Sequence, residues 1–190
     1  MSRRHLGFTI IELALVIIVI GILSTIVIVS YQGVQVRARD AKLIDAADKV
    51  KDAIQLFVSN NGHFPRGGSG SSAAIGVGKE CANGDAGWIA PGNYTCTVED
   101  TLVASGYLPS GFSSGLPQNK EWSTSPQNKA IMVYLAPATR KAMVYYSMEN
   151  PSSSDSAHFN DELTKCGYDP GGAIGPRDSF GMKNGVCFDY

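Results

Sequence analysis

The stretch Arg3–Leu23, RRHLGFTIIELALVIIVIGIL, decides how the rest of this chain is organised. Apolar residues fill nearly all of the run from Phe8 to Val29, and polar side chains occur there at four positions only: Thr9, Glu12, Ser24 and Thr25. At ~1.5 Å per residue, a helix over this run could cross a hydrocarbon core ~30 Å thick. A charge inside such a segment costs roughly 2.5–3.5 kcal/mol on insertion scales, and such residues are usually functional. The stretch therefore predicts a membrane helix in which Glu12 has a specific task.

The apolar run is predicted to stay in the protein. Arg3 and Arg4 precede it, as in a secretory signal peptide, but no small-x-small cleavage site closes it, because Ile26–Ser30 reads IVIVS. The two arginines favour a start on the cytoplasmic side of the membrane, although Arg37 and Arg39 beyond the run weaken that preference. We expect a single-pass membrane segment.

The length, charge and composition limit the kinds of protein that this chain can be. With 190 residues, the chain is long enough for one domain with a real core. Its net charge of −1, from 16 basic and 17 acidic residues, argues against a large surface for binding polyanions, and we predict no specific nucleic-acid partner. The 21 glycines predict long irregular loops.

The cysteines indicate disulfides and an oxidising compartment. They lie at Cys81, Cys96, Cys166 and Cys187, and none forms the short CxxC spacing that is typical of zinc ligands. Four buried free thiols are the alternative. The sequence allows three connectivities. Pairing near neighbours, Cys81 with Cys96 and Cys166 with Cys187, closes two loops that do not cross.

One long helix is predicted from about Phe8 to about Ser59. No proline precedes Pro65, so nothing before it must break a helix. In the second half, apolar residues recur at steps of three and four: Leu43, Ala47, Val50, Ile54 and Phe57. We expect this stripe to pack on a sheet and the charges between Asp40 and Asp52 to form a solvated face. The turn sequence NNGHFP, Asn60–Pro65, ends the helix.

The remaining pattern predicts an α+β fold, because antiparallel strands follow a long helix. Arg66–Glu80 has the composition of a flexible loop. The other elements are predicted from local signals: a short helix within Asp100–Phe112 capped by an Asp or Thr, a hairpin of strands Ala130–Ala136 and Ala142–Met148, a short polar helix within Asn150–Cys166, and a last strand at Gly185–Phe188.

The motif GFTIIE, Gly7–Glu12, resembles the class III signal of type IV prepilins, because a short basic leader precedes it and an apolar helix follows it. The resemblance implies that a prepilin peptidase cuts between Gly7 and Phe8 and N-methylates Phe8. It also implies that Glu12 is needed for assembly and for recognition during methylation. The helix end at NNGHFP is similar to the NGxYP boundary of many pilins and pseudopilins.

A physical role for Glu12 agrees with this resemblance. Cleavage after Gly7 would create a positive amine at Phe8, which the carboxylate one turn away in the same chain cannot easily reach. An axially shifted neighbour can bring its own Glu12 to that amine, and the pair removes two isolated charges from an apolar environment. Glu12 is then a registration device for a polymer. The alternative is a carboxylate that merely reaches the membrane interface.

The resemblance also implies the pilin fold: a long helical spine packed on a small antiparallel sheet, with a carboxy-terminal loop bounded by the Cys166–Cys187 disulfide. In such filaments the helix often unwinds between positions that match Gly21 and Gly33. Many relatives have a proline where this chain has Val29, so the extent of unwinding is left open.

No catalytic or metal-binding pattern is found, and we expect neither an enzyme nor a cofactor. His5, His63 and His158 lie in no nucleophile motif. The carboxy-terminal third contains scattered acidic residues without the ligand spacing of a calcium site, and we expect them to be solvated: Asp155, Asp161, Glu162, Asp169 and Asp178.

Four segments are therefore expected: a cleaved leader over 1–7, a membrane and fibre-core helix over 8–33, an amphipathic helical half over 34–60 and a head over 61–190. The resemblance implies a type IV pilus subunit that forms a homopolymer and serves adhesion, twitching motility or DNA uptake. Its implied partners are the prepilin peptidase, the assembly platform and the motor. It would reside in the inner membrane before assembly and then in the extracellular filament on the bacterial surface.

Two other classes remain open. A pseudopilin of a type II secretion or competence system shares the signal and the fold, although the major secretion pseudopilin resembles a compact head with a calcium loop and no disulfides. An anchored binding protein with an uncleaved helix would keep Met1 or Ser2 at its terminus and form no polymer.

Overall fold

The computed structural model describes residues 9–66, 86–89, 97–117, 130–136 and 138–190. The chain divides into two compact units, Met1–Ala38 and Arg39–Tyr190, which are described separately here. The first unit contains the beginning of helix α1, and the second contains the rest of α1 and all other elements.

Helix α1 runs over Ile10–Asn61, which confirms the predicted long helix, and it ends two residues later than expected. Its end is a glycine cap: Gly62 has a φ of 77°, and its N–H donates to the Val58 carbonyl oxygen at 2.8 Å. A left-handed backbone of this kind is far easier for glycine than for other residues. The NNGHFP turn thus acts as the sequence indicated.

The sheet has four antiparallel strands in the order β1-β2-β3-β4: Ala86–Ile89, Ile131–Leu135, Lys141–Tyr146 and Asn184–Asp189. The predicted hairpin is β2–β3, and the predicted last strand is β4. Strand β1 lies between Cys81 and Cys96, where no strand was predicted. Its short sequence, AGWI, contains no alternation that would distinguish it from a turn.

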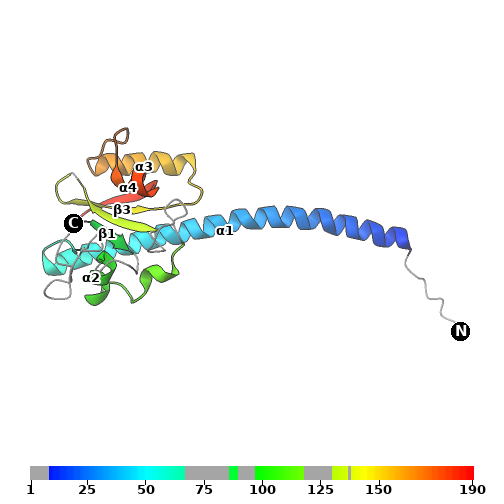
Figure 1. The fold of residues 1–190 in the computed structure, drawn as a ribbon, viewed down its shortest axis with the longest axis horizontal. Helices are drawn as coiled ribbons and strands as arrows, with labels where there is room; N and C mark the ends of the chain where they lie inside the picture. Colours follow the sequence, from blue (N-terminus) through cyan, green and yellow to red (C-terminus); the bar gives the residue numbers. More distant parts are fainter. Residues whose placement is uncertain (1–8, 67–85, 90–96, 118–129, 137) are drawn as a thin grey trace. The chain divides into compact units, whose positions relative to one another are not determined.

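One face of the sheet packs against the long helix α1 and the short helix α2, Val98–Ala104 (Figure 1). The predicted stripe of α1 is buried, with Val50, Ile54 and Phe57 fully enclosed. From the sheet, this core takes alternate residues of the central strands, such as Ile131 and Val144. The core is therefore formed by every second residue of the central strands and by the residues of α1 that recur at steps of three and four.

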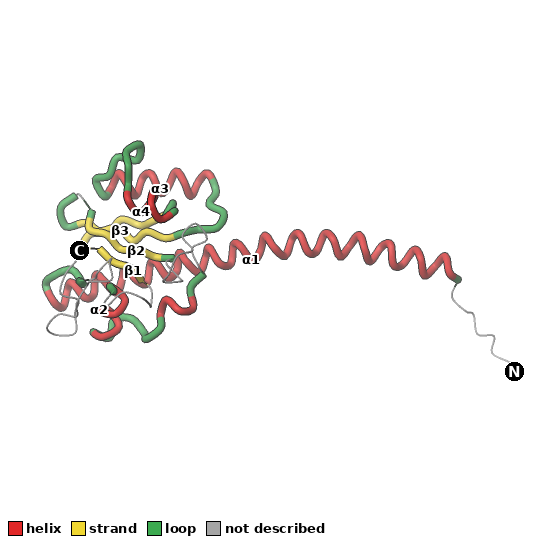
Figure 2. Tube along the Cα trace, in the orientation of Figure 1, coloured by secondary structure: helices red, strands yellow, loops and turns green. Residues whose placement is uncertain are grey.

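The opposite face is covered by α3, Ser153–Lys165, and α4, Gly175–Phe180, so the sheet lies between two helical layers (Figure 2). Met132, Met143 and Tyr145 pack there against Phe159 and Leu163 of α3. The sequence pattern indicated a short polar helix in this region, and α3 is longer than that and buries one face. Helix α4 was not predicted.

Burial on both faces explains Gly185 in strand β4. A Cβ atom there would lie 2.7 Å from Cε of Met143 and 2.9 Å from the Val144 carbonyl oxygen. Only a residue without a side chain fits this position without displacing strand β3.

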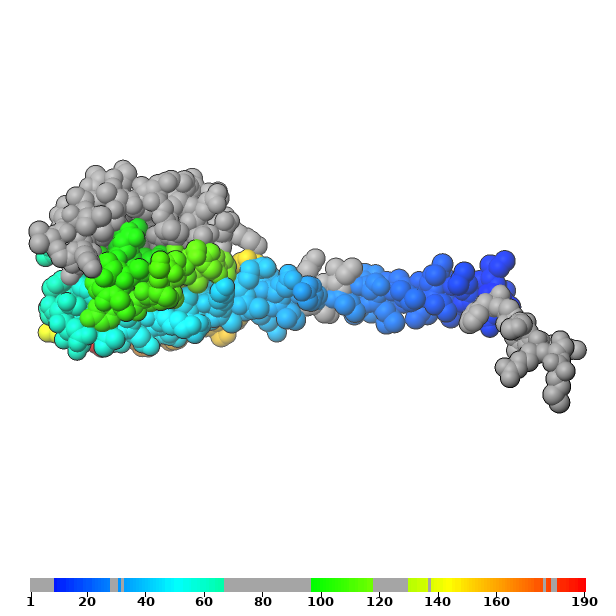
Figure 3. All heavy atoms as spheres, turned by 90° about the horizontal axis from the view of Figure 1, so that it is seen from below, coloured from blue at the N-terminus to red at the C-terminus, as the bar shows by residue number. Residues whose placement is uncertain are grey.

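Helix α2 begins earlier than predicted. Its N-cap is Thr97, whose hydroxyl accepts a hydrogen bond from the Asp100 N–H at 3.1 Å, while the Asp100 carboxylate accepts one from the Thr97 N–H at 2.7 Å. Asp100 therefore completes a capping box inside the helix and does not start it. The segment continues through the 3-10 helix η1, Phe112–Gly115, and lies along the second half of α1 (Figure 3).

Candidate assembly site

The first unit presents an apolar helix that the fold does not cover. Within the described residues, one helical window, Ile10–Val27, is long and apolar enough to cross a membrane, with a mean hydropathy of 2.9, and none of it is buried. Ile10 is 88% exposed, and Ile17 and Leu13 are each more than half exposed. An apolar surface of this extent on a soluble monomer would be unusual, so it must meet lipid or other protein.

Glu12 lies in the first turn of this apolar surface and is held by Thr9. Oε2 of Glu12 accepts hydrogen bonds from the Thr9 backbone N–H at 2.9 Å and from the Thr9 hydroxyl at 2.7 Å, and the Glu12 N–H donates to that hydroxyl oxygen at 3.2 Å. This reciprocal arrangement is a capping box at the start of α1. Sequence reasoning did not find this role of Thr9, although the T-x-x-E spacing contains the signal.

The carboxylate of Glu12 is only half used by this cap. Oε1 has no hydrogen-bond donor among the residues that the structure describes. The oxygen is therefore open to a donor from outside the chain. Gly7 and Phe8, the predicted cleavage and methylation positions, lie outside the described residues and remain predictions.

In the second unit, the start of its α1 segment is fixed to the connection between β3 and α3. Arg39 binds Glu149 through two parallel hydrogen bonds of 2.8 Å, from Nε to Oε1 and from Nη2 to Oε2. Such bidentate pairs are strong and directional. The hydrogen bonds to Glu149 raise the pKa of Arg39 above its usual value, which keeps the guanidinium charged.

Asp40 supplies a second, buried attachment at the same place. It is 5% exposed, and its carboxylate accepts hydrogen bonds from the backbone N–H groups of Glu149 at 2.8 Å and Asn150 at 3.4 Å. The expectation that Asp40 belongs to a solvated charged face is wrong. The helix period places Asp40 beside the buried stripe. The β3–α3 connection brings two backbone N–H groups to this position, and the Asp40 carboxylate accepts hydrogen bonds from both.

The carboxy-terminal loop is closed as predicted by a disulfide between Cys166 and Cys187, whose Cα atoms lie 5.7 Å apart. The Cys166 carbonyl oxygen accepts a hydrogen bond from the Ala138 N–H at 3.1 Å. The end of α3 is thus joined both to β4 and to the turn that follows β2. Cys81 and Cys96 lie outside the described residues, and their pairing remains a prediction.

Glu162 on α3 corrects a second expectation. It was assigned to a solvated acidic loop, but it is 3% exposed. Its Oε2 accepts a hydrogen bond from the Cys187 N–H at 2.7 Å, and its Oε1 pairs with Nζ of Lys165. The Glu162 carboxylate therefore links α3 to the edge strand β4. It is buried because the packing of α3 on the sheet places Glu162 next to the backbone of Cys187.

Within the loop, Arg177 organises the chain around its guanidinium group. It donates to the carbonyl oxygens of Pro170 at 2.7 Å and Gly172 at 2.6 Å, and it pairs with Asp178. The pairing with Arg177 lowers the pKa of Asp178, which also accepts a hydrogen bond from the Ile174 N–H. Across the described residues, no group of three or more His, Cys, Asp or Glu side chains is placed to hold a metal ion.

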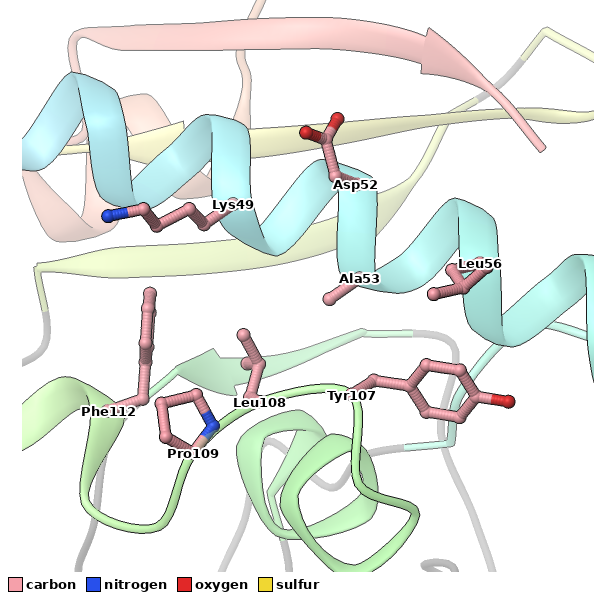
Figure 4. Close-up of a pocket in the computed structure, with 8 residues that line it drawn as sticks. All are labelled: Lys49, Asp52, Ala53, Leu56, Tyr107, Leu108, Pro109 and Phe112. Atoms are coloured by element: carbon pink, nitrogen blue, oxygen red, sulfur yellow. The ribbon is translucent and has the colours of Figure 1, made fainter.

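A groove of about 520 Å³ lies in the second unit between α1 and the α2–η1 segment (Figure 4). Its α1 side is formed by four residues: Lys49, Asp52, Ala53 and Leu56. The facing side is formed by four more: Tyr107, Leu108, Pro109 and Phe112. We call this feature the α1 groove. It is mainly apolar, with the two charged residues on its helical side.

Comparison with known proteins gives several curated relatives. Over 80 residues, 42% of this chain and 46% of the relative, the sequence is 34% identical to a fimbrial protein of Neisseria meningitidis serogroup B. Over 139 residues, 72% of this chain and 91% of the relative, it is 29% identical to fimbrial protein EcpC of Eikenella corrodens. Over 74 residues, 39% of this chain and 52% of the relative, it is 27% identical to type II secretion system core protein G of Aeromonas hydrophila.

These similarities are partial. The chain spans about half the length of the Neisseria and Aeromonas relatives and nearly all of EcpC. No family model matches the sequence, and no solved structure matches the fold. The fold of this chain has the arrangement that the resemblance to pilins implied: a long amino-terminal helix, an antiparallel sheet packed on its second half, and a disulfide-bounded carboxy-terminal loop. The chain is thus similar in sequence to type IV pilins and other fimbrial proteins.

Proposed function

We propose that this chain is a structural subunit of a type IV pilus and that it polymerises through its amino-terminal helix. The observation that carries the proposal is the uncovered apolar surface of Ile10–Val27, which contains one carboxylate in its first turn. The rest of the chain forms a head that has its own hydrophobic core. A helix of this kind is stable in lipid, and the same surface can be buried among copies of itself in a filament.

In this proposal Glu12 registers neighbouring subunits. Cleavage between Gly7 and Phe8 gives a positive amine at Phe8, which is then methylated. The capping box orients the Glu12 carboxylate through Oε2 and leaves Oε1 for the amine of an axially shifted neighbour. Subunits out of register would leave both charges unpaired in an apolar core, which costs several kcal/mol in effective terms.

The expected segments follow from this function. Residues 1–7 are the leader that the prepilin peptidase removes, 8–33 form the membrane and fibre-core helix, 34–60 its amphipathic half and 61–190 the head. Before assembly the chain is a single-pass protein of the inner membrane, where the assembly platform and the motor act on it. Afterwards it is part of an extracellular filament for adhesion, motility or DNA uptake. We propose no catalytic role.

A second candidate is a pseudopilin of a type II secretion or competence system. The similarity to core protein G of Aeromonas hydrophila favours it. A pseudopilin would be processed at the same site but would remain in the cell envelope. The two candidates are separated by whether the processed chain is found in filaments sheared from the cell surface.

The test of the proposal is Glu12→Ala. We expect the variant to insert into the membrane as the wild type does, because removing a charge favours insertion. Filaments sheared from the surface should be lost. Thr25→Val is the matched control: Thr25 is a polar residue of the same helix whose hydroxyl donates only to the Gly21 carbonyl oxygen of its own chain. A normal filament yield from Glu12→Ala would contradict the proposed role of this residue.

A further inference from the structure

The α1 groove has the properties of a binding surface for an apolar side chain. Ala53 and Leu108 form its buried floor, and Phe112 and Tyr107 stand at either end of the facing side (Figure 4). Leu56 lines the groove and is 55% exposed, so its side chain lies largely open to solvent. A mainly apolar cavity of about 520 Å³ is in the range that holds organic groups.

The chain itself contains an apolar turn with no cover. Val34 is 62% exposed and Tyr31 is 61% exposed, and both follow the apolar window that ends at Val27. Val34 also lies beyond the proposed membrane helix of residues 8–33, so lipid around that helix does not account for its exposure. Arg37 follows Val34 by three residues, which places the two side chains next to each other on the helix surface. Arg37 is exposed and makes no ion pair with any residue that the structure describes.

The spacing and charge of this turn match the helical side of the groove. Lys49 and Asp52 are also three residues apart. The Asp52 side chain is 72% exposed, and its contact within the chain is a long ion pair of 3.8 Å between Oδ1 and Nζ of Lys51. Helices in a filament of identical subunits run in the same direction. An axial shift of about 22 Å between two copies brings Arg37 of one copy level with Asp52 of the other. Val34 then lies level with Lys49, at the end of the groove that Phe112 closes.

We propose that in the filament the α1 groove of one subunit receives the Val34–Arg37 turn of another copy, with Val34 in the groove and Arg37 paired with Asp52. The inference rests on the proposed function, because it requires a polymer of parallel copies. It adds a second contact beyond Glu12, between the helix of one subunit and the head of another, and it assigns Leu56 and Phe112 to an interface.

Charge reversal tests the pairing of Arg37 with Asp52. Arg37→Glu and Asp52→Arg should each reduce the yield of sheared filaments about tenfold, a change that corresponds to about 1.4 kcal/mol per contact. The double variant, which restores opposite charges in exchanged positions, should recover most of the yield. Asp161→Lys, an exposed charge reversal on α3, is the matched control and should have no effect.

A cross-link tests the geometry independently. A chain with Arg37→Cys and Asp52→Cys should form a ladder of disulfide-linked oligomers in sheared filaments after mild oxidation, and neither single variant should form one. Val34→Glu should lower the filament yield, whereas Ile44→Glu, at an exposed residue of α1 outside the groove, should not.

The outcomes separate this inference from the proposed function. If the wild type forms no surface filament, the proposed function fails and this inference fails with it. If the wild type forms filaments but single reversals leave their yield unchanged, or if the double variant is not rescued and no ladder forms, the pilus assignment stands and the contact proposed here is wrong.

Discussion

A single carboxylate, Asp40, shows where local sequence pattern stops being informative. The pattern of charges between apolar positions assigns it to the solvated face of α1, as it does for Asp45 and Asp48. The structure buries Asp40 and gives its two oxygens to the N–H groups of Glu149 and Asn150. These partners are more than a hundred residues away in sequence, so no local signal could identify them. Asp40 differs from Asp45 and Asp48 because the folded chain brings the β3–α3 connection next to it, and the helix period of α1 contains no information about that contact.

Asp40→Ala should destabilise the head by about 1–3 kcal/mol, because two backbone N–H groups in a partly buried connection lose their acceptor. The measurement is the denaturant midpoint of the full chain in detergent, followed by a signal from the head. Asp161→Ala, at an exposed position on α3, is the control and should leave the midpoint unchanged. If both variants unfold at the wild-type midpoint, Asp40 is no anchor of the helix.

Among the elements, long or strongly patterned ones were predictable and short ones were not. Helix α1 has an unbroken helical pattern and a glycine cap, and the β2–β3 hairpin consists of β-branched and aromatic residues. Strand β1 and helix α4 have only a few residues each and depend on their neighbours. Their positions are determined by pairing with β2 and by packing on the sheet, which are tertiary effects.

The α3 layer depends on the disulfide at its end. Cys166→Ser with Cys187→Ser should lower the free energy of unfolding by about 3 kcal/mol, the value expected for a loop of about 20 residues in the chain-entropy account. The denaturant midpoint of the full chain measures this. Thr164→Ala is the control, since Thr164 is an exposed residue of the last turn of α3. An unchanged midpoint in the serine variant would mean that packing and the Glu162 contact alone hold this layer.

For the molecule as a whole, the sequence predicted the long helix, the sheet packed on it and the Cys166–Cys187 disulfide, and it did not predict every layer of the head. The spine, the stripe on its second half and the antiparallel sheet were expected, and they are present. The second helical layer was not expected, because a polar sequence such as that of α3 hides its few apolar contacts, Phe159 and Leu163. The assembly residues at Gly7 and Phe8 remain predictions from the motif alone.

The intact mass of this chain in material sheared from the cell surface is the most direct test of whether it is a pilus subunit. We expect a mass equal to residues Phe8–Tyr190 with one added methyl group and two disulfides. A processed chain that is found only in the membrane would favour the pseudopilin. A full-length chain that begins at Met1 or Ser2 would contradict both cleavage between Gly7 and Phe8 and the role proposed for Glu12.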